Sequence, residues 1–232
     1  MAVLYLVPTP ISENSMDSVL PVDVVSIIKS LKQFVVEDIR TARRFLKKLN
    51  HPIAIEDLQF RILNEHTSFS ETASLLPYLL AENTGIMSEA GLPCLADPGA
   101  KLVRLAHANG ITVVPLSGSS AIIMALIASG LNGQSFSFVG YLPVKRNERQ
   151  ARLSVLEKRS AVEQQTQIFI ETPYRNIALM EDIVHCCRSE TLITIAAGIT
   201  GPDEYILTQT VQQWKKRLPD IKNVPAVFLL QA

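Results

Sequence analysis

The stretch Ser88-Glu89-Ala90-Gly91-Leu92-Pro93-Cys94-Leu95-Ala96-Asp97-Pro98-Gly99 decides how this sequence folds. It follows a short apolar run, 85–87, and leads into a helical pattern over 101–109. Two glycines and two prolines in twelve residues exclude a helix or a central strand. A strand, a stiff loop with two carboxylates and a helix is how open α/β sheets build ligand crevices. We therefore predict a binding loop at the carboxyl end of a strand, against the simpler alternative of a structural connection.

The composition is that of a globular protein. The chain has 232 residues, 47% of them hydrophobic, with 22 basic and 22 acidic side chains. A net charge of zero argues against a protein that coats nucleic acid nonspecifically, but it leaves room for local basic patches. The cysteines Cys94, Cys186 and Cys187 lack metal-binding spacing and indicate buried thiols in a reducing compartment. We predict no metal site, no signal peptide, no membrane span and a cytoplasmic location.

Apolar runs alternate with helical patterns along the chain. The runs 3–7, 34–36 and 111–115 are apolar almost throughout, as expected of strands buried on both faces of a parallel sheet. After Ser135 the pattern restarts, and a candidate hairpin around Gly201 indicates some antiparallel pairing. We predict an α/β fold of two α/β domains, 1–116 and 117–232, with mostly parallel sheets and a more mixed second domain. A ligand cleft is expected between them.

Two segments carry clusters of cations. In the predicted helix 39–49, one face is apolar and the other carries Arg40, Arg43, Arg44, Lys47 and Lys48. A second cluster follows the loop after Tyr141 and comprises Lys145, Arg146, Arg149 and Arg152. A stripe of this kind is most often a solvated face, but five cations without an interleaved acid also suit a polyanionic partner.

A second turn of small residues enters a strongly apolar helix. Leu116-Ser117-Gly118-Ser119-Ser120 precedes the segment 121–129, which is apolar nearly all round and is expected to be buried. Free backbone N–H groups and hydroxyls at this helix start serve for capping, and they are equally suited to a ligand.

Seven blocks of this sequence resemble the tetrapyrrole methylase superfamily of S-adenosylmethionine-dependent methyltransferases. The similarity is greatest to the branch that 2′-O-methylates a cytidine ribose of small-subunit ribosomal RNA. The blocks keep the family order over about three quarters of the chain. They are 4–11, 36–40, 64–66, 88–99, 115–121, 140–143 and Glu171-Thr172-Pro173-Tyr174-Arg175.

Some positions depart from the branch pattern. The Pro-Ile-Gly-Asn expected after the first strand is Pro10-Ile11-Ser12-Glu13, and Ser-Asp-Ala-Gly-Thr-Pro is 88–93 with Glu89 and Leu92. The Arg-His-Thr expected after the acid pair 37–38 is 40–42, Arg-Thr-Ala. These changes leave methyl-donor binding in place and keep two alternatives open. One is a small acidic acceptor such as a tetrapyrrole, and the other is a non-catalytic relative that binds the donor.

The resemblance implies S-adenosylmethionine as cofactor, folded in the interdomain cleft, and a homodimer. It places donor binding at Pro8, Ser88, Glu89, Ala90, Gly91, Pro93, Asp97, Gly118, Ser119, Ser120, Ala121 and Tyr141.

A ribose hydroxyl is a weak nucleophile that a base or a charge would activate. The candidate catalytic residues are Glu37, Asp38, Arg40, Glu65 and His66, although the acids 37–38 could equally cap the next helix and His66 could be structural. The candidate RNA-binding residues are Arg40, Arg44, Lys47, Lys145 and Arg146.

Overall fold

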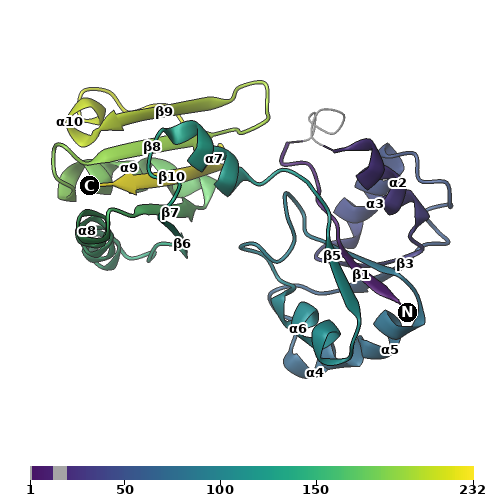
Figure 1. The fold of residues 1–232 in the computed structure, drawn as a ribbon. Helices are drawn as coiled ribbons and strands as arrows, with labels where there is room; N and C mark the ends of the chain where they lie inside the picture. Colours follow the sequence, from purple (N-terminus) through teal and green to yellow (C-terminus); the bar gives the residue numbers. More distant parts are fainter. Residues whose placement is uncertain (1, 13–19) are drawn as a thin grey trace. The chain divides into compact units, whose positions relative to one another are not determined.

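The computed structural model describes residues 2–12 and 20–232, so that Glu13 of the altered first loop lies outside the described residues. The chain divides into two compact units, Met1–Ser120 and Ala121–Ala232. Figure 1 shows both units with their elements labelled.

The first unit is built on a five-stranded parallel sheet with the strand order β3-β2-β4-β1-β5. Its strands are β1 (Val3–Leu6), β2 (Gln33–Val36), β3 (Gln59–Ile62), β4 (Thr84–Met87) and β5 (Thr112–Pro115). Its helices are α2 (Val22–Ser30), α3 (Ile39–Lys48), α4 (Phe69–Ser74), α5 (Leu76–Ala81) and α6 (Ala100–Ala108). The predicted parallel α/β architecture is confirmed.

Alternating side chains of the central strands fill a core on each face of this sheet. Phe34 and Val36 of β2 pack with residues of α2 and α3, whereas Val35 packs with residues of α5 and α6. The helices accordingly lie on opposite sides of the sheet in Figure 1. Because every strand runs the same way, the segments that follow β1, β2, β4 and β5 all leave the sheet at one edge.

The second unit contains a mixed sheet with the strand order β6-β7-β10-β8-β9. Only β6 and β7 pair in parallel, and the other pairs are antiparallel, including the predicted hairpin of β8 and β9. The strands are β6 (Phe136–Tyr141), β7 (Thr166–Glu171), β8 (Leu192–Ala197), β9 (Tyr205–Thr210) and β10 (Ala226–Gln231). The helices are α7 (Ala121–Ser129), α8 (Arg146–Glu163), the 3-10 helix η1 (Pro173–Arg175), α9 (Asn176–Cys186) and α10 (Val211–Trp214). The predicted mixed character is confirmed.

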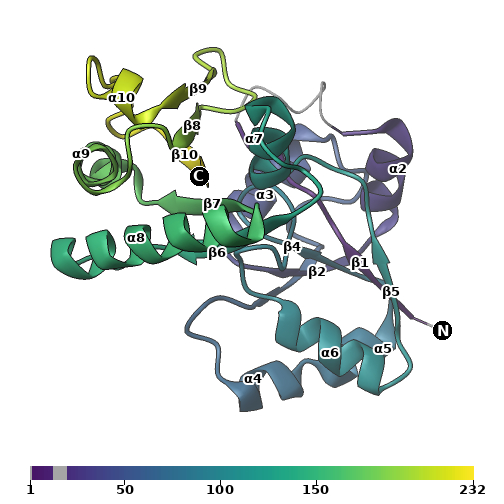
Figure 2. The same cartoon turned by 60° about the vertical axis from the view of Figure 1, so that its left-hand side comes forward.

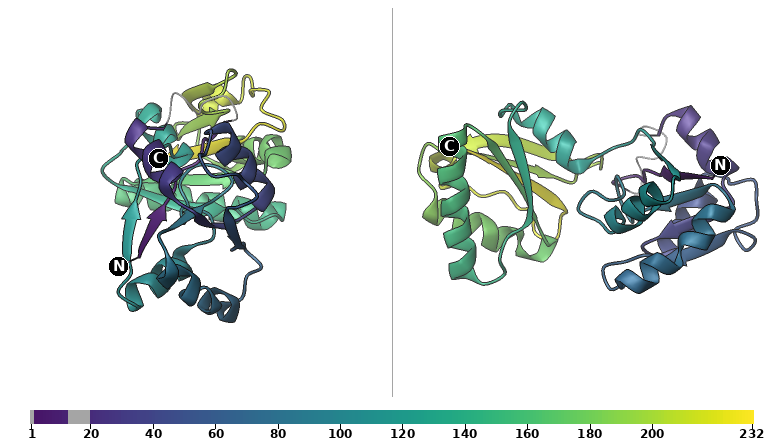
Figure 3. Two further views of the ribbon diagram at one scale, coloured as in Figure 1. Left: turned by 90° about the vertical axis from the view of Figure 1, so that its right-hand side faces the viewer. Right: turned by 60° about the horizontal axis from the view of Figure 1, so that its bottom comes forward.

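Helices cover both faces of the second sheet. Phe228 of β10 packs in a core with residues of α8 and α9, while Val227 and Leu229 point to the other face, where α7 lies (Figures 2 and 3). The prediction that α7 is buried all round is wrong, because Ile127 is 76% exposed. One side of α7 packs on the strands β8, β9 and β10.

Candidate active site

The loop after β4 is held in an unusual backbone conformation. Gly91, Cys94, Ala96 and Gly99 all have positive φ, at 81°, 69°, 68° and 136°. Non-glycine residues rarely adopt this conformation, and such strain gathers at functional sites. The loop is anchored to the segment after β1 by two backbone hydrogen bonds, from Thr9 N to Gly91 O (2.9 Å) and from Gly91 N to Thr9 O (3.0 Å). The two segments therefore form one rigid wall.

The turn after β5 joins this wall. A Cβ on Gly118 would lie 2.1 Å from Pro8 Cβ, so only glycine permits this approach. A Cβ on Gly91 would lie 3.6 Å from Ser119 O. The structure thus brings together three stretches that are far apart in sequence, and each contains residues predicted to bind the donor. Ala121 and Tyr141 belong to the second unit, where the Tyr141 side chain is 58% exposed at the end of β6.

Three carboxylates gather at the same edge of the first sheet. Glu37 Oε2 accepts a hydrogen bond from Glu89 N (3.4 Å). Burial and the neighbouring charge of Asp97 raise the pKa of Glu37, although the bond from Glu89 opposes the shift. Burial and the charge of Glu89 likewise raise the pKa of Asp97, against the nearby Ser88 hydroxyl. No ion pair among the described residues involves Glu37 or Asp97, so these acids have a stronger tendency to hold a proton than exposed carboxylates.

The other predicted catalytic residues lie outside this group. Asp38 caps α3, with Oδ1 accepting a hydrogen bond from Thr41 N (2.7 Å), and this bond lowers the pKa of Asp38. Glu65 and His66 lie in the turn after β3, with side chains 82% and 85% exposed and 3.5 Å between Oε1 and Nε2. Arg40 is exposed on the first turn of α3. Glu37 is therefore the predicted base that the structure places beside the strained loop.

The cations of α3 divide into two groups. Arg44 and Lys48 line a pocket of about 400 Å³ that also touches Thr9–Ser12 and Ser88–Ala90. Arg43 instead lies over the Phe60 ring, with 5.5 Å from Cζ to the ring centroid. Lys47 is exposed and does not line the pocket. The cations of α3 therefore belong to two different surfaces of the first unit.

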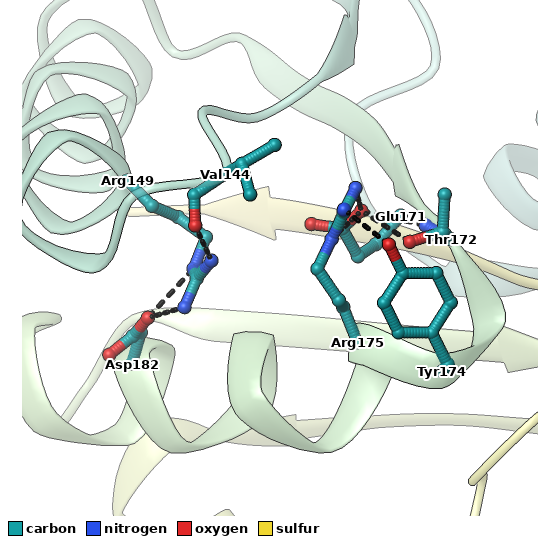
Figure 4. Close-up of polar contacts among 7 residues, drawn as sticks. All are labelled: Val144, Arg149, Glu171, Thr172, Tyr174, Arg175 and Asp182. Atoms are coloured by element: carbon teal, nitrogen blue, oxygen red, sulfur yellow. Dashed lines mark hydrogen bonds and ion pairs between the residues drawn. The ribbon is translucent and has the colours of Figure 1, made fainter.

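Three cations of the second cluster, Lys145, Arg146 and Arg149, form ion pairs with acids of the second unit. Arg149 is buried and donates from Nε to Asp182 Oδ2 (2.7 Å) and from Nη1 to Val144 O (2.9 Å), as Figure 4 shows. Arg146 Nε donates to Asp182 Oδ1 (2.9 Å), and Lys145 Nζ lies 3.3 Å from Glu148 Oε1. The charge of Arg149 is therefore paired with Asp182 inside the second unit.

No family model matches the chain, but curated proteins do. The ribosomal RNA small subunit methyltransferase I of Bacillus subtilis is 38% identical over 217 residues, which cover 92% of this chain and 69% of that protein. Its namesake in Vibrio cholerae is 34% identical over 88% of this chain and 67% of that protein. The chain belongs to the ribosomal RNA small subunit methyltransferase I family. It is a methyltransferase, and its methyl donor is S-adenosylmethionine.

A solved structure supports the fold of this family member. The crystal structure of the methyltransferase CobJ matches with a TM-score of 0.64 over 100% of this chain and 94% of that one, at 14% identity.

No helix in the described ranges combines the length and the apolar character needed to cross a membrane. Within the same ranges, no cluster of three or more His, Cys, Asp or Glu side chains could hold a metal ion.

The residues of the first unit fit the methyl donor. A sulfonium is cationic, and the donor also carries hydroxyl and amino groups. The carboxylates Glu89 and Asp97 match those groups, and Ser88 Oγ is buried without a hydrogen bond of normal geometry to any described residue. The close approach at Gly118 leaves backbone groups, rather than bulky side chains, on the wall. Such a wall suits a cofactor that the protein must mainly hold in place.

Sequence reasoning missed the buried ion pairs of the second unit. Glu171 Oε1 accepts hydrogen bonds from Arg175 Nε (2.9 Å) and Thr172 N (2.7 Å), and Arg175 Nη1 donates to Tyr174 Oη (2.9 Å; Figure 4). The block 171–175 was recognisable by its similarity to the family, but that similarity did not disclose the pairing. The Arg149–Asp182 pair had no signal in the sequence.

Proposed function

We propose that this family member methylates the 2′-hydroxyl of a ribose in small-subunit ribosomal RNA. The observation that carries the proposal is the meeting of three predicted donor-binding loops beside the carboxylate Glu37. Family membership favours an RNA acceptor over the two alternatives, a small acidic acceptor and a non-catalytic donor-binding relative.

The wall of the first unit would hold the donor. Its residues are Pro8, the loop 88–93, Asp97 and the turn 118–120. When bound, S-adenosylmethionine would supply a methyl group that an oxygen nucleophile attacks in line, with the neutral thioether as the leaving group. The strained backbone at Cys94 and Ala96 fixes the loop before binding, so that little order has to be gained when the reactants meet.

Glu37 would act as the general base. Its carboxylate takes the proton of the ribose 2′-hydroxyl while that oxygen forms its bond to the methyl carbon, and the electron pair of the broken bond stays on sulfur. A raised pKa makes Glu37 a stronger base than an exposed glutamate. Asp38 is committed to capping α3, so it is not needed for this step.

The location and assembly of the protein are also proposals. The resemblance to the family implies a homodimer. A cytoplasmic location is supported by a ribosomal RNA substrate and by three free cysteines. Sedimentation of the purified protein at several concentrations tests the dimer, and a monomer at every concentration contradicts it.

Transfer of radiolabelled methyl groups to undermethylated small-subunit RNA tests the proposed function. We expect incorporation above a heat-inactivated control and a labelled linkage that resists alkali, because a methylated 2′-oxygen cannot attack the neighbouring phosphate. No incorporation overturns the RNA substrate. Incorporation into an alkali-sensitive linkage overturns the ribose as acceptor. Calorimetry with S-adenosylmethionine establishes separately that the donor binds.

A further inference from the structure

We infer that the pocket between α3 and the loops after β1 and β4 receives one unpaired nucleotide of the RNA, with Arg44 and Lys48 on its phosphate. This inference rests on the proposed function and names the part of the molecule that takes the acceptor. The pocket has a volume of about 400 Å³ and is lined entirely by residues of the first unit.

The charge on one side of the pocket suits a phosphate. Arg44 and Lys48 are four residues apart on α3, so they project from the same side of the helix. Among the described residues that line the pocket, Glu89 is the one acid, and it belongs to the loop on the opposite side. This distribution of charge favours a phosphate near α3 and a ribose hydroxyl near Glu89.

The size and remaining lining suit one nucleotide. Phe45 and Ala42 of α3 and Pro10 and Ile11 of the first loop give the pocket an apolar part. Sequence-specific recognition of RNA generally uses unpaired nucleotides whose bases meet apolar or aromatic side chains. A space of about 400 Å³ lies within the range of small-ligand pockets and is far too small for a double helix.

The position of the pocket supports the same conclusion. Ser88, Glu89 and Ala90 line it, and they belong to the loop predicted to hold the donor. Glu37 is hydrogen-bonded to the backbone of Glu89, so the proposed base adjoins the same wall. A nucleotide in this pocket therefore contacts the loop predicted to hold the donor, and Glu37 is one hydrogen bond away from the lining residue Glu89.

Adjacent lysines provide a matched test. Lys47 and Lys48 are both exposed near the end of α3, but only Lys48 lines the pocket. The variants Lys48→Glu and Lys47→Glu change charge equally and keep similar helix propensity. Binding of a fluorescent single-stranded RNA that contains the methylated site is measured from low to high salt. Calorimetry with S-adenosylmethionine is the second readout.

We expect Lys48→Glu to weaken RNA binding at least about 10-fold and to reduce the salt slope by about 0.7, the value for one lost phosphate contact on a single strand. Lys47→Glu should change both much less, and both variants should bind the donor normally. Equal losses in the two variants overturn the proposed role of the pocket, because they indicate that RNA responds only to the overall positive charge of α3. Loss of donor binding in Lys48→Glu also overturns it, since the pocket then belongs to the donor. If the wild-type protein transfers no methyl group to RNA, the proposed function fails instead.

Discussion

The carboxylates of the first unit and those of the second are held in opposite ways. Glu37 and Asp97 lie at the edge of a parallel sheet and form no ion pair with a described residue, and burial raises the pKa of both. Burial also acts on Asp182, but hydrogen bonds from Gln150, Arg149 and Arg146 outweigh it, and the pKa of Asp182 is lowered. Asp182 is more deeply buried than Glu37 or Asp97, so its lowered pKa comes from its hydrogen-bond partners and not from its burial.

This difference indicates which carboxylates can take part in catalysis and which stabilise the fold. A carboxylate that is paired and hydrogen-bonded holds its charge firmly and cannot accept a proton near neutral pH. A half-buried carboxylate beside like charges is poised to accept one. We therefore expect substitutions at Asp182 and its partners to change stability, whereas substitutions at Glu37 should change turnover.

The largest effect is expected from Arg149→Ala. It leaves the Asp182 carboxylate, which is 1% exposed, without its buried partner and should cost about 3–5 kcal/mol of unfolding free energy. Trp214, the only tryptophan, is buried in the second unit, so its fluorescence reports this loss directly. Arg152→Ala on the exposed side of the same helix should stay within about 0.5 kcal/mol. Equal effects of the two variants would mean that the ion pair adds nothing beyond packing.

Glu37→Gln tests whether the carboxylates of the first unit take part in catalysis. Loss of a general base should lower methyl transfer at least about 100-fold, with donor affinity retained. In the wild-type protein, activity should fall as the pH decreases through the raised pKa of Glu37, because the base becomes protonated. The variant should lack this acidic decline.

Asp38→Asn is the matched control for Glu37→Gln. Asparagine caps helices as well as aspartate does, so α3 should persist and turnover should not change. If Asp38→Asn lowers turnover as much as Glu37→Gln, Glu37 is not the sole base and Asp38 takes part in the proton transfer.

Gly118→Ala tests whether the first unit builds its site from backbone. The added Cβ would lie 2.1 Å from Pro8 Cβ, and the two loops would have to move apart. We expect a loss of about 1–3 kcal/mol in stability and weaker donor binding by calorimetry. Gly133→Ala, which meets no atom within 4 Å, is the control. Normal donor affinity in Gly118→Ala contradicts a donor site at this turn.

The fold could be predicted because short stretches of the sequence indicate its strands, helices and loops. The apolar runs 3–7 and 34–36 fill both faces of a sheet, and the Gly/Pro loop 88–99 marks the strand end where ligands bind. The buried ion pairs could not be predicted in the same way. Arg149 and Asp182 are 33 residues apart on different helices, and only tertiary packing brings them together.

The site could be predicted at the level of loops but not of single side chains. Neighbouring residues on a helix point about 100° apart, so the sequence could not tell whether Lys47 or Lys48 faces a pocket. The roles of Glu37 and Asp38 were ambiguous for a related reason. Both follow β2, and only the bond from Thr41 N reveals which one caps α3.

The smallest effect is expected from Asp97→Asn, and its sign should be opposite to that of Asp182→Asn. Because the folded state raises the pKa of Asp97, its stabilising effect is complete below the unfolded value of about 3.9 and is lost as the pH rises through the folded value. At pH 7 the ionised side chain therefore destabilises the first unit, and Asp97→Asn should stabilise it by less than about 1 kcal/mol.

For Asp182 the folded pKa is lowered, so its contribution is present above about 3.9 and disappears as the pH falls through the folded value. Asp182→Asn should thus destabilise the second unit at pH 7, with a deficit that shrinks on acidification. Urea unfolding between pH 3 and 7, followed by circular dichroism for the whole chain and by Trp214 fluorescence for the second unit, measures both. Destabilisation by Asp97→Asn at pH 7 would show that Asp97 is held by a partner, and the contrast between the two units would then fail.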